Sequence, residues 1–223
     1  NSISVLAMAS KDGFLHAPDV YMDKIAVGAG LPDGVIDLDK SPKENLTAVA
    51  KAKGCDIADL VVCVLDRERH QKLISDIREA GARILLISDG DITGIIATTK
   101  SDTNIDMYMG IGGAPEGVLA AAALRCIGGQ MQGRLLFDND EQRARAKRMG
   151  IEDLDKKYTM YDLAKGEVMF AATGVTDGPM LTGVRRKAGG AETHSIIMRS
   201  KTGTVRDIHA HHNFHRKTWV DKD

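Results

Sequence analysis

Acidic residues and glycines follow two apolar segments of the chain. Asp89 and Asp91 flank a glycine directly after the apolar run 84–87. The second segment, Gly110–Gly117, is rich in glycine, carries Glu116 and leads into an alanine-rich run. Each pattern is typical of a strand end that precedes a helix, and open α/β sheets bind ligands at that edge. Carboxylates beside a glycine loop would suit a cation or the hydroxyls of a sugar.

Each of these features also has a purely structural interpretation. Asp91 could cap the N-terminus of a helix, which is a common role of aspartate, although this explains only one of the two carboxylates. Glu116 would fall in the first turn of a helix, where the helix dipole favours a negative charge. The glycine spacing does not match the G-x-G-x-x-G dinucleotide fingerprint, and the acidic partner of that motif is missing.

Two arginines, Arg67 and Arg69, follow the apolar run 61–65 and open a predicted helix. Guanidinium groups at a helix N-terminus match the geometry of phosphate oxygens. The alternative is a solvated helix start with both side chains in water. Basic residues are unfavourable in a first turn, so an anion that compensates them is the favoured interpretation.

Three further features are weaker. Tyr21 is either a tyrosine at the edge of the core or a hydroxyl that reaches a phosphate. The segment 173–178 could contact a ligand, but a plain turn is favoured. His209 and His211 would share one strand face and could form a metal pair. No third spaced ligand supports that pair, so a solvated strand end is the favoured interpretation.

The elements that would position these residues alternate along the chain. Apolar runs predict strands at 3–8, 24–27, 35–38, 60–65, 82–87, 105–109, 130–137 and 168–172, and a hairpin that joins 195–198 to 204–211. Helices are predicted at 68–80, 92–99, 115–127, 141–149 and 161–164. Another helix begins at Ser41, where Pro42 and Glu44 complete a capping box, and ends at Gly54. Residues 187–191 and those after 212 are expected to be loose.

Near-continuous apolar strands that alternate with helices indicate a sheet covered on both faces. Residues 61–127 should therefore form a parallel or mixed α/β unit. The chain has 223 residues, with 30 basic and 31 acidic side chains, so its charge favours neither nucleic acid nor a membrane as partner. Three cysteines form no motif. The expectation is a soluble, cytoplasmic protein without a membrane-spanning segment.

The chain begins with Asn1 inside a strand-like pattern and without an initiator methionine. Because strands need partners unless they lie at an edge, this start is expected to be the middle of a longer protein. A processed N-terminus is the less favoured alternative, since processing normally leaves a polar, flexible start.

Several motifs occur together in one order. They lie at 1–6, 17–22, 67–70 and 89–91, followed by Gly-Gly-Ala-Pro-Glu-Gly at 112–117 and Ala-Thr-Gly-Val-Thr-Asp-Gly at 172–178. In this combination the chain resembles the bacterial class II fructose-1,6-bisphosphatases over essentially its whole length. The resemblance implies a layered α-β-α-β-α sugar-phosphatase fold with mixed sheets. Residues 1–60 would be the end of an N-terminal sheet region with a connecting helix, and residues 61–223 a C-terminal substrate-binding domain.

The resemblance also implies an activity: hydrolysis of the 1-phosphate of fructose-1,6-bisphosphate in gluconeogenesis by a homo-oligomer that uses Mn²⁺ or Mg²⁺. By position, Glu116 would be a metal ligand, and Arg67 and Arg69 would bind phosphate. Asp89 and Asp91 would bind the sugar, with Gly113 beside them. Tyr21 would make a further contact with the substrate. Arg67 stands where the family often has lysine. The other metal carboxylates and a catalytic Asp-Pro-x-Glu-Gly-Thr motif belong to an N-terminal segment of the family that this sequence does not contain. The chain is therefore expected to hold no catalytic residue and to be incomplete for catalysis.

Two alternatives stay open. The enzyme could also accept sedoheptulose-1,7-bisphosphate, because the sugar contacts would be nearly the same. The chain could instead be a phosphosugar-binding module without chemistry.

Overall fold

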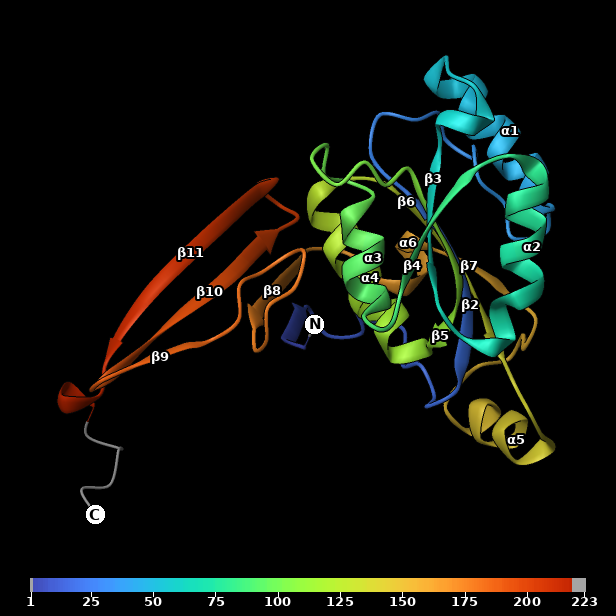
Figure 1. Cartoon of the computed structure of the whole chain (residues 1–223). Coiled ribbons are helices and arrows are strands. Elements are labelled where there is room, and N and C mark those ends of the chain that lie inside the picture. Colours follow the sequence, from blue (N-terminus) through green and yellow to red (C-terminus); the bar gives the residue numbers. More distant parts are fainter. Residues whose placement is uncertain (1, 218–223) are drawn as a thin grey trace.

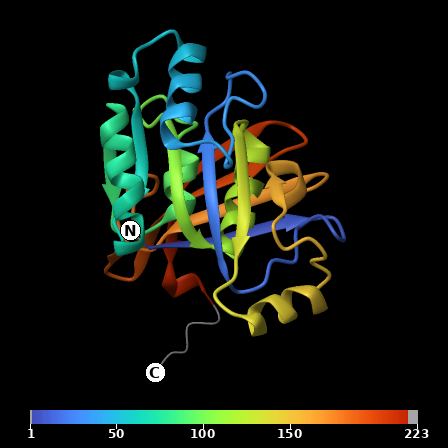
Figure 2. The ribbon, with the colours of Figure 1, turned by 90° about the vertical axis from the view of Figure 1, so that its right-hand side faces the viewer.

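Two β-sheets with helices between them form the molecule (Figure 1). The structure is a computed structural model that describes residues 2–217. The strands of the six-stranded sheet lie in the order β4-β3-β5-β2-β6-β7, and those of the five-stranded sheet in the order β1-β8-β10-β11, with β9 paired to β10. The strands of the two sheets run in crossing directions (Figure 2).

The strands are β1 (Ile3–Ala9), β2 (Tyr21–Val27), β3 (Val61–Leu65), β4 (Arg83–Ile87), β5 (Met107–Gly113), β6 (Gln130–Leu136), β7 (Lys157–Thr159), β8 (Val168–Gly174), β9 (Arg185–Lys187), β10 (Gly190–Arg199) and β11 (Thr204–Asn213). The α-helices are α1 (Pro42–Lys53), α2 (Gln71–Ala80), α3 (Asp91–Ala97), α4 (Ala114–Ile127), α5 (Asp140–Arg148) and α6 (Met160–Leu163). Short 3₁₀ turns are η1 (Ile57–Asp59), η2 (Glu68–His70) and η3 (Phe214–Arg216).

The layers follow from which faces are apolar. Helices α1 and α2 bury Leu46, Val49, Ile74 and Ile77 against one face of the six-stranded sheet. Helices α3, α4 and α6 fill the space between the two sheets, where the run Ala120–Ala123 of α4 is fully buried. Alanine suits this place because a small side chain lets the helix approach the strands closely. The prediction of a layered α/β fold is confirmed, with one mixed sheet of six strands and one sheet of five strands whose pairs are all antiparallel.

The six-stranded sheet is mixed. Strand β3 pairs parallel with β4 and β5, whereas β2 pairs antiparallel with β5 and β6. The carboxyl ends of β3, β4 and β5 therefore lie at one edge. The start of β2 lies there too, because Tyr21 is paired with Gly113 at the end of β5. No helix among residues 2–217 is long and apolar enough to cross a membrane.

Local signals placed most elements well. The capping box of α1 is present, with Ser41 and Glu44 bonded to each other's backbone and Gly54 in the left-handed region at φ +67°. The predicted hairpin is confirmed by β10 and β11. The free cysteines Cys63 and Cys126 are buried.

The predicted strand at 35–38 is wrong. This segment has no strand partner, because side-chain amides of β6 bind its backbone instead. Gln132 accepts from the amide of Leu38 and donates to the carbonyl of Ile36, while Gln130 accepts from the amide of Gly34. The apolar run 35–38 thus indicated burial correctly, but its backbone is bound by side chains and not by a neighbouring strand.

Residues 187–191 were expected to be loose but lie in the sheet. Strand β9 pairs with the start of β10 across a tight turn in which Gly189 has φ +71°. All three residues of β9 are exposed, so the sequence carries no apolar alternation there. The end of the chain after residue 212 was also expected to be loose, but β11 continues to Asn213 and η3 follows it. Residues 218–223 of that end lie outside the described residues.

The glycine loop is also partly wrong. Gly110, Gly112 and Gly113 belong to strand β5 rather than to a loop, and helix α4 begins directly after them. The reason is space: a Cβ on Gly110 would lie 3.3 Å from the ring of His70, and one on Gly112 would collide with Asp91. These glycines allow neighbouring side chains to approach the strand.

Candidate functional site

The predicted site residues follow neighbouring strands at one edge of the six-stranded sheet. Arg67 and Arg69 come after β3, Asp89 and Asp91 after β4, and Glu116 after β5. Tyr21 begins β2 at the same edge. The topology therefore brings together residues that are far apart in the sequence.

Arg69 and His70 together hold one residue of β5. The Nε and Nη2 of Arg69 donate to the carbonyl of Ile111 at 3.1 and 2.9 Å. The backbone amide of Ile111 donates to Nε2 of His70 at 2.8 Å. Both backbone groups of Ile111 are thus fixed by consecutive side chains of the segment after β3, which places that segment against the end of β5.

His70 was not singled out from the sequence, although it is buried and central to this contact. Its Nε2 accepts a hydrogen bond, so its Nδ1 carries the proton and donates to the carbonyl of Leu65 at 2.7 Å. Burial lowers the pKa of His70 from its ordinary value, and the nearby Arg69 adds to this effect. The imidazole is therefore neutral near pH 7, as both of its hydrogen bonds require.

The guanidinium of Arg69 also lies over the ring of Tyr21, with 4.9 Å between Cζ and the ring centroid. This cation–π contact orients both side chains at the edge of the sheet. Tyr21 is 44% exposed, so the arginine and the tyrosine lie together at the surface of this edge. Arg67 is exposed and donates to the carbonyl of Asp66 at 3.1 Å. Both arginines keep N–H donors available for an anion.

Lys24 lies beneath these residues and was missed by sequence reasoning. It is 1% exposed, forms an ion pair with Asp91, and donates to the carbonyl of Gly113 at 2.9 Å. Burial lowers the pKa of Lys24, while the charge of Asp91 counteracts this shift. The only available signal was a lysine inside the apolar run of β2.

Asp91 is 7% exposed, and both carboxylate oxygens have internal partners. Oδ2 faces Lys24, and Oδ1 accepts from the amide of Ile92 at 2.9 Å. Asp91 is the first residue of α3, and Gly90 occupies the N-cap position without a side-chain cap bond, so the predicted capping role of Asp91 is wrong. The sugar contact that the resemblance implies for Asp91 stays a prediction.

Glu116 lies in the first turn of α4, and its carboxylate folds back over Gly113, where any Cβ would collide with it. It is exposed and makes no hydrogen bond or ion pair within residues 2–217. A free carboxylate that is oriented by a helix start suits a hard cation such as Mg²⁺ or Mn²⁺, since these ions take one or two protein carboxylates and complete their shell with water and phosphate oxygens. The donor chemistry therefore fits the implied metal.

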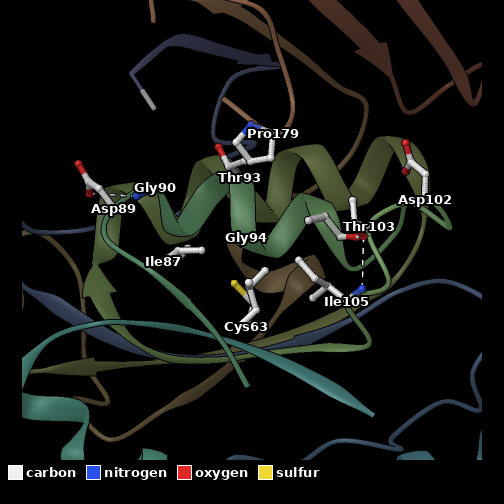
Figure 3. Close-up of a pocket in the computed structure, with 12 residues that line it drawn as sticks. Cys63, Ile87, Asp89, Gly90, Thr93, Gly94, Asp102, Thr103, Ile105 and Pro179 are labelled. Atoms are coloured by element: carbon white, nitrogen blue, oxygen red, sulfur yellow. Dashed lines mark hydrogen bonds between the residues drawn. The ribbon is translucent and has the colours of Figure 1, made fainter. Parts of the chain in front are cut away.

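Asp89 lies at one end of a cavity of about 230 Å³ beside α3 (Figure 3). Its Oδ1 accepts from the amide of Gly90 at 2.9 Å, and the side chain is exposed. Asp102 lies at the other end of the cavity, Pro179 on its rim and Cys63 on its floor (Figure 3). Burial raises the pKa of the Cys63 thiol to about 12, so this cysteine is an inert part of the wall.

The histidines lie elsewhere, on β10 and β11. His194, Asp207 and His209 offer ligand atoms within 4.8 Å of one another, and the two imidazole rings are stacked. His211 is paired instead with Glu192 at 2.9 Å. The Nδ1 of His194 accepts from the amide of Thr182 at 3.0 Å, so its Nε2 carries the proton and donates to Asp207. Metal-bound histidines normally donate from the other ring nitrogen, so this arrangement fits a hydrogen-bonded pair better than a metal site.

The segment 173–178 forms the end of β8 and the turn after it. Asp177 stabilises this turn by accepting from the amide of Gly183 at 2.9 Å and from Arg185 at 2.8 Å. The hydrogen bonds of this aspartate therefore have a structural role.

Comparison with known proteins decides the family. A family model described as bacterial fructose-1,6-bisphosphatase, glpX-encoded, matches residues 1–212. The chain belongs to this family. The resemblance inferred from the motifs is thereby confirmed.

Relatives of the chain carry one shared name, D-fructose 1,6-bisphosphatase class 2/sedoheptulose 1,7-bisphosphatase. The protein from Synechococcus sp. (strain JA-3-3Ab) is 46% identical over 224 residues, and that from Trichodesmium erythraeum (strain IMS101) is 45% identical over 226 residues. These matches cover 95% and 96% of the chain but 64% and 65% of the relatives. The chain thus spans slightly less than two thirds of their length.

Proposed function

We propose that this chain supplies the substrate-binding part of a fructose-1,6-bisphosphatase, which hydrolyses the 1-phosphate to give fructose 6-phosphate and inorganic phosphate. The observation that carries the proposal is the convergence of Arg69, Tyr21, Gly113 and Glu116 at one sheet edge in a chain of this family. The proposal concerns the full-length protein, because the relatives whose names state this activity are longer than the chain.

Arg67 and Arg69 bind the distal phosphate in this proposal. Arg69 is held by Ile111 and Tyr21, so its position is fixed before a ligand arrives. A preorganised guanidinium loses little freedom when it binds, which favours both affinity and orientation. The hydroxyl of Tyr21 lies beside it and provides a further phosphate contact.

The sugar occupies the edge between α3 and α4. Asp89 has an exposed carboxylate that accepts hydrogen bonds from the furanose hydroxyls. Gly113 lets the ligand approach the backbone next to Glu116, and Asp91 forms the wall between them through its bond to Lys24.

Glu116 holds one divalent ion, Mn²⁺ or Mg²⁺, and the remaining ligands come from the part of the protein outside this chain. Such an ion, when bound, polarises the scissile phosphate and lowers the pKa of a water molecule. The contribution of this chain is to orient the substrate against that ion. A homo-oligomer, a cytoplasmic location and a place in gluconeogenesis belong to the same proposal.

Sedoheptulose-1,7-bisphosphate is a second candidate substrate, because the shared name of the relatives pairs both activities. The residues assigned above recognise phosphates and hydroxyls, which both sugars carry, and do not discriminate between sugars of different chain length. Activity on both bisphosphates would establish dual specificity, whereas activity on one alone would decide between them.

The test is phosphate release from fructose-1,6-bisphosphate by the full-length protein, with and without Mn²⁺. Glu116→Gln keeps the shape of the side chain but removes its charge, and we expect turnover to fall by about 100-fold, in line with the loss of an essential metal contact. Glu141→Gln is the matched control, because Glu141 is also an exposed glutamate in the first turn of a helix. Wild-type turnover and unchanged metal dependence in Glu116→Gln would contradict the assignment.

A further inference from the structure

We propose that Lys24 is a positioning residue of this site: its ammonium joins the starts of α3 and α4 and thereby sets the places of Gly113 and Glu116. The inference rests on the proposed function, since it explains how the substrate and metal contacts are held. It assigns a role to a residue that touches neither ligand.

The burial of Lys24 needs an explanation. Its side chain is entirely inaccessible, and an ammonium in the interior carries a large desolvation penalty unless it is well paired. Apolar residues in place of a whole buried ion pair often give equal or greater stability. Met22, which precedes it on the same face of β2, shows that this face accepts an apolar side chain. Lys24 is therefore poorly explained as a stabilising residue alone.

The partners of Lys24 lie at the starts of two different helices. Asp91 is the first residue of α3, and Gly113 is the residue that precedes α4. One ammonium binds the carboxylate of the first and the carbonyl of the second. Because these contacts lie in the interior, they fix the separation of the two helix starts more firmly than a solvated pair would.

The glycines of the site make room for this lysine. A Cβ on Gly112 would lie 2.9 Å from the Nζ of Lys24 and would collide with Asp91. A Cβ on Gly117 would lie 3.3 Å from its Cδ. The glycine-rich sequence that suggested close approach of a ligand is therefore explained in part by the close approach of Lys24 and Asp91.

The charge of Lys24 also reaches the predicted metal ligand. Glu116 and Asp91 both favour the charged form of Lys24, whereas Arg69 opposes it. The ammonium thus offsets the repulsion between two carboxylates that face the same edge. Without it, Asp91 would lose its charged partner, and the carbonyl of Gly113 at the start of α4 would lose a hydrogen bond.

The experiment compares Lys24→Met with wild type in the full-length protein. We expect the affinity for Mn²⁺, measured from the paramagnetic resonance signal of the free ion, to fall by about tenfold or more, as when other residues that orient metal ligands are removed. The KM for fructose-1,6-bisphosphate should rise as well, while circular dichroism shows a folded protein. Lys157→Met is the matched control, because Lys157 pairs with Asp37 and Asp39 elsewhere in the same sheet, and it should leave both quantities unchanged.

Lys24→Arg keeps a folded comparison available if the buried, unpaired Asp91 unfolds the methionine variant. Arginine retains the charge and the donors, but its planar group cannot take the place of an ammonium in so crowded a site. We expect a smaller loss of Mn²⁺ affinity than in Lys24→Met. Wild-type Mn²⁺ affinity and KM in a folded variant of Lys24 would overturn the inference.

The two proposals fail in different ways. If the wild-type protein releases no phosphate from fructose-1,6-bisphosphate, the proposed function is wrong, and the Mn²⁺ affinities still decide the role of Lys24. If the wild type is active and the folded variants equal it, only the role of Lys24 is overturned.

Discussion

Two regions of the molecule concentrate charged side chains, and they use them differently. At the edge of the six-stranded sheet, Lys24, His70 and Asp91 are buried and bind backbone groups. On β10 and β11, Asp207 and His209 are more than half exposed and bind chiefly other side chains. Both regions contain histidines and carboxylates at short distances. Their sequences alone do not reveal which of them is buried.

The difference shows where charge organises the structure. An exposed ion pair gains little, because water competes for both partners and the side chains lose freedom. A buried group that lacks a partner costs far more, so burial makes each contact at the sheet edge obligatory. Ligand-binding geometry is more reliably built from the second kind of contact, and this is why the site is assigned to the sheet edge.

The largest effect is expected when a methyl group is added at the edge. Gly112→Ala would push a Cβ into the Lys24–Asp91 pair, and we expect it to cost about 3 kcal/mol, the upper end of the range for overpacking. Gly203→Ala in the turn between β10 and β11 meets no atom within 4 Å, although its φ of +57° favours glycine, so it should cost only about 1 kcal/mol. Urea-induced unfolding of the full-length protein measures both values. Equal losses of stability in the two variants would mean that Lys24 and Asp91 can move to accommodate the added methyl group.

The sequence predicted the parts of the site that depend on local order. The positions of Arg69, Asp89 and Glu116 after strands, and the strand–helix alternation, were sufficient to place them at one edge. The antiparallel pairing of β2 that brings in Tyr21 follows from long-range contacts, so the place of Tyr21 at the site was implied only by the resemblance.

The missing parts depend on contacts that no local pattern encodes. Lys24 was invisible because its partners, Asp91 and Gly113, lie 67 and 89 residues away. The glycines were interpreted as a loop because glycine normally interrupts strands. Their actual reason, the space needed by side chains from α3 and β2, exists only in the folded chain.

A smaller effect, which depends on pH, is expected at His70. Its pKa is lowered by burial, so the unfolded chain takes up a proton at a higher pH than the folded chain. The stabilising contribution of His70 is therefore complete above the ordinary value of 6.5 and is lost as the pH falls through the lower folded pKa. His70→Gln should cost about 2 kcal/mol at pH 7.5, because two buried backbone bonds are broken.

The difference between wild type and His70→Gln should therefore shrink between pH 7.5 and pH 5.5, measured by urea-induced unfolding at each pH. His16→Gln is the control, because His16 is exposed, and it should follow the wild type at both values. A difference that stays constant or widens at low pH would show that the neutral imidazole of His70 is not what holds Ile111.

The smallest effect is expected at the other region. Asp207→Asn removes a charge from an exposed cluster, but its amide oxygen can still accept from the Nε2–H of His194, so stability should change by no more than about 0.5 kcal/mol.

The same variant tests whether His194, Asp207 and His209 form a metal site. A bound ion stabilises only the folded state, so added Ni²⁺ would raise the unfolding temperature of the wild type and not of the variant. We expect no such difference, because the Nδ1 of His194 already accepts from Thr182 and its Nε2 is protonated. A higher unfolding temperature with Ni²⁺ in the wild type alone would show that the exposed cluster rearranges its hydrogen bonds to bind an ion. The two regions would then differ in whether they hold an ion and not in how their side chains are held.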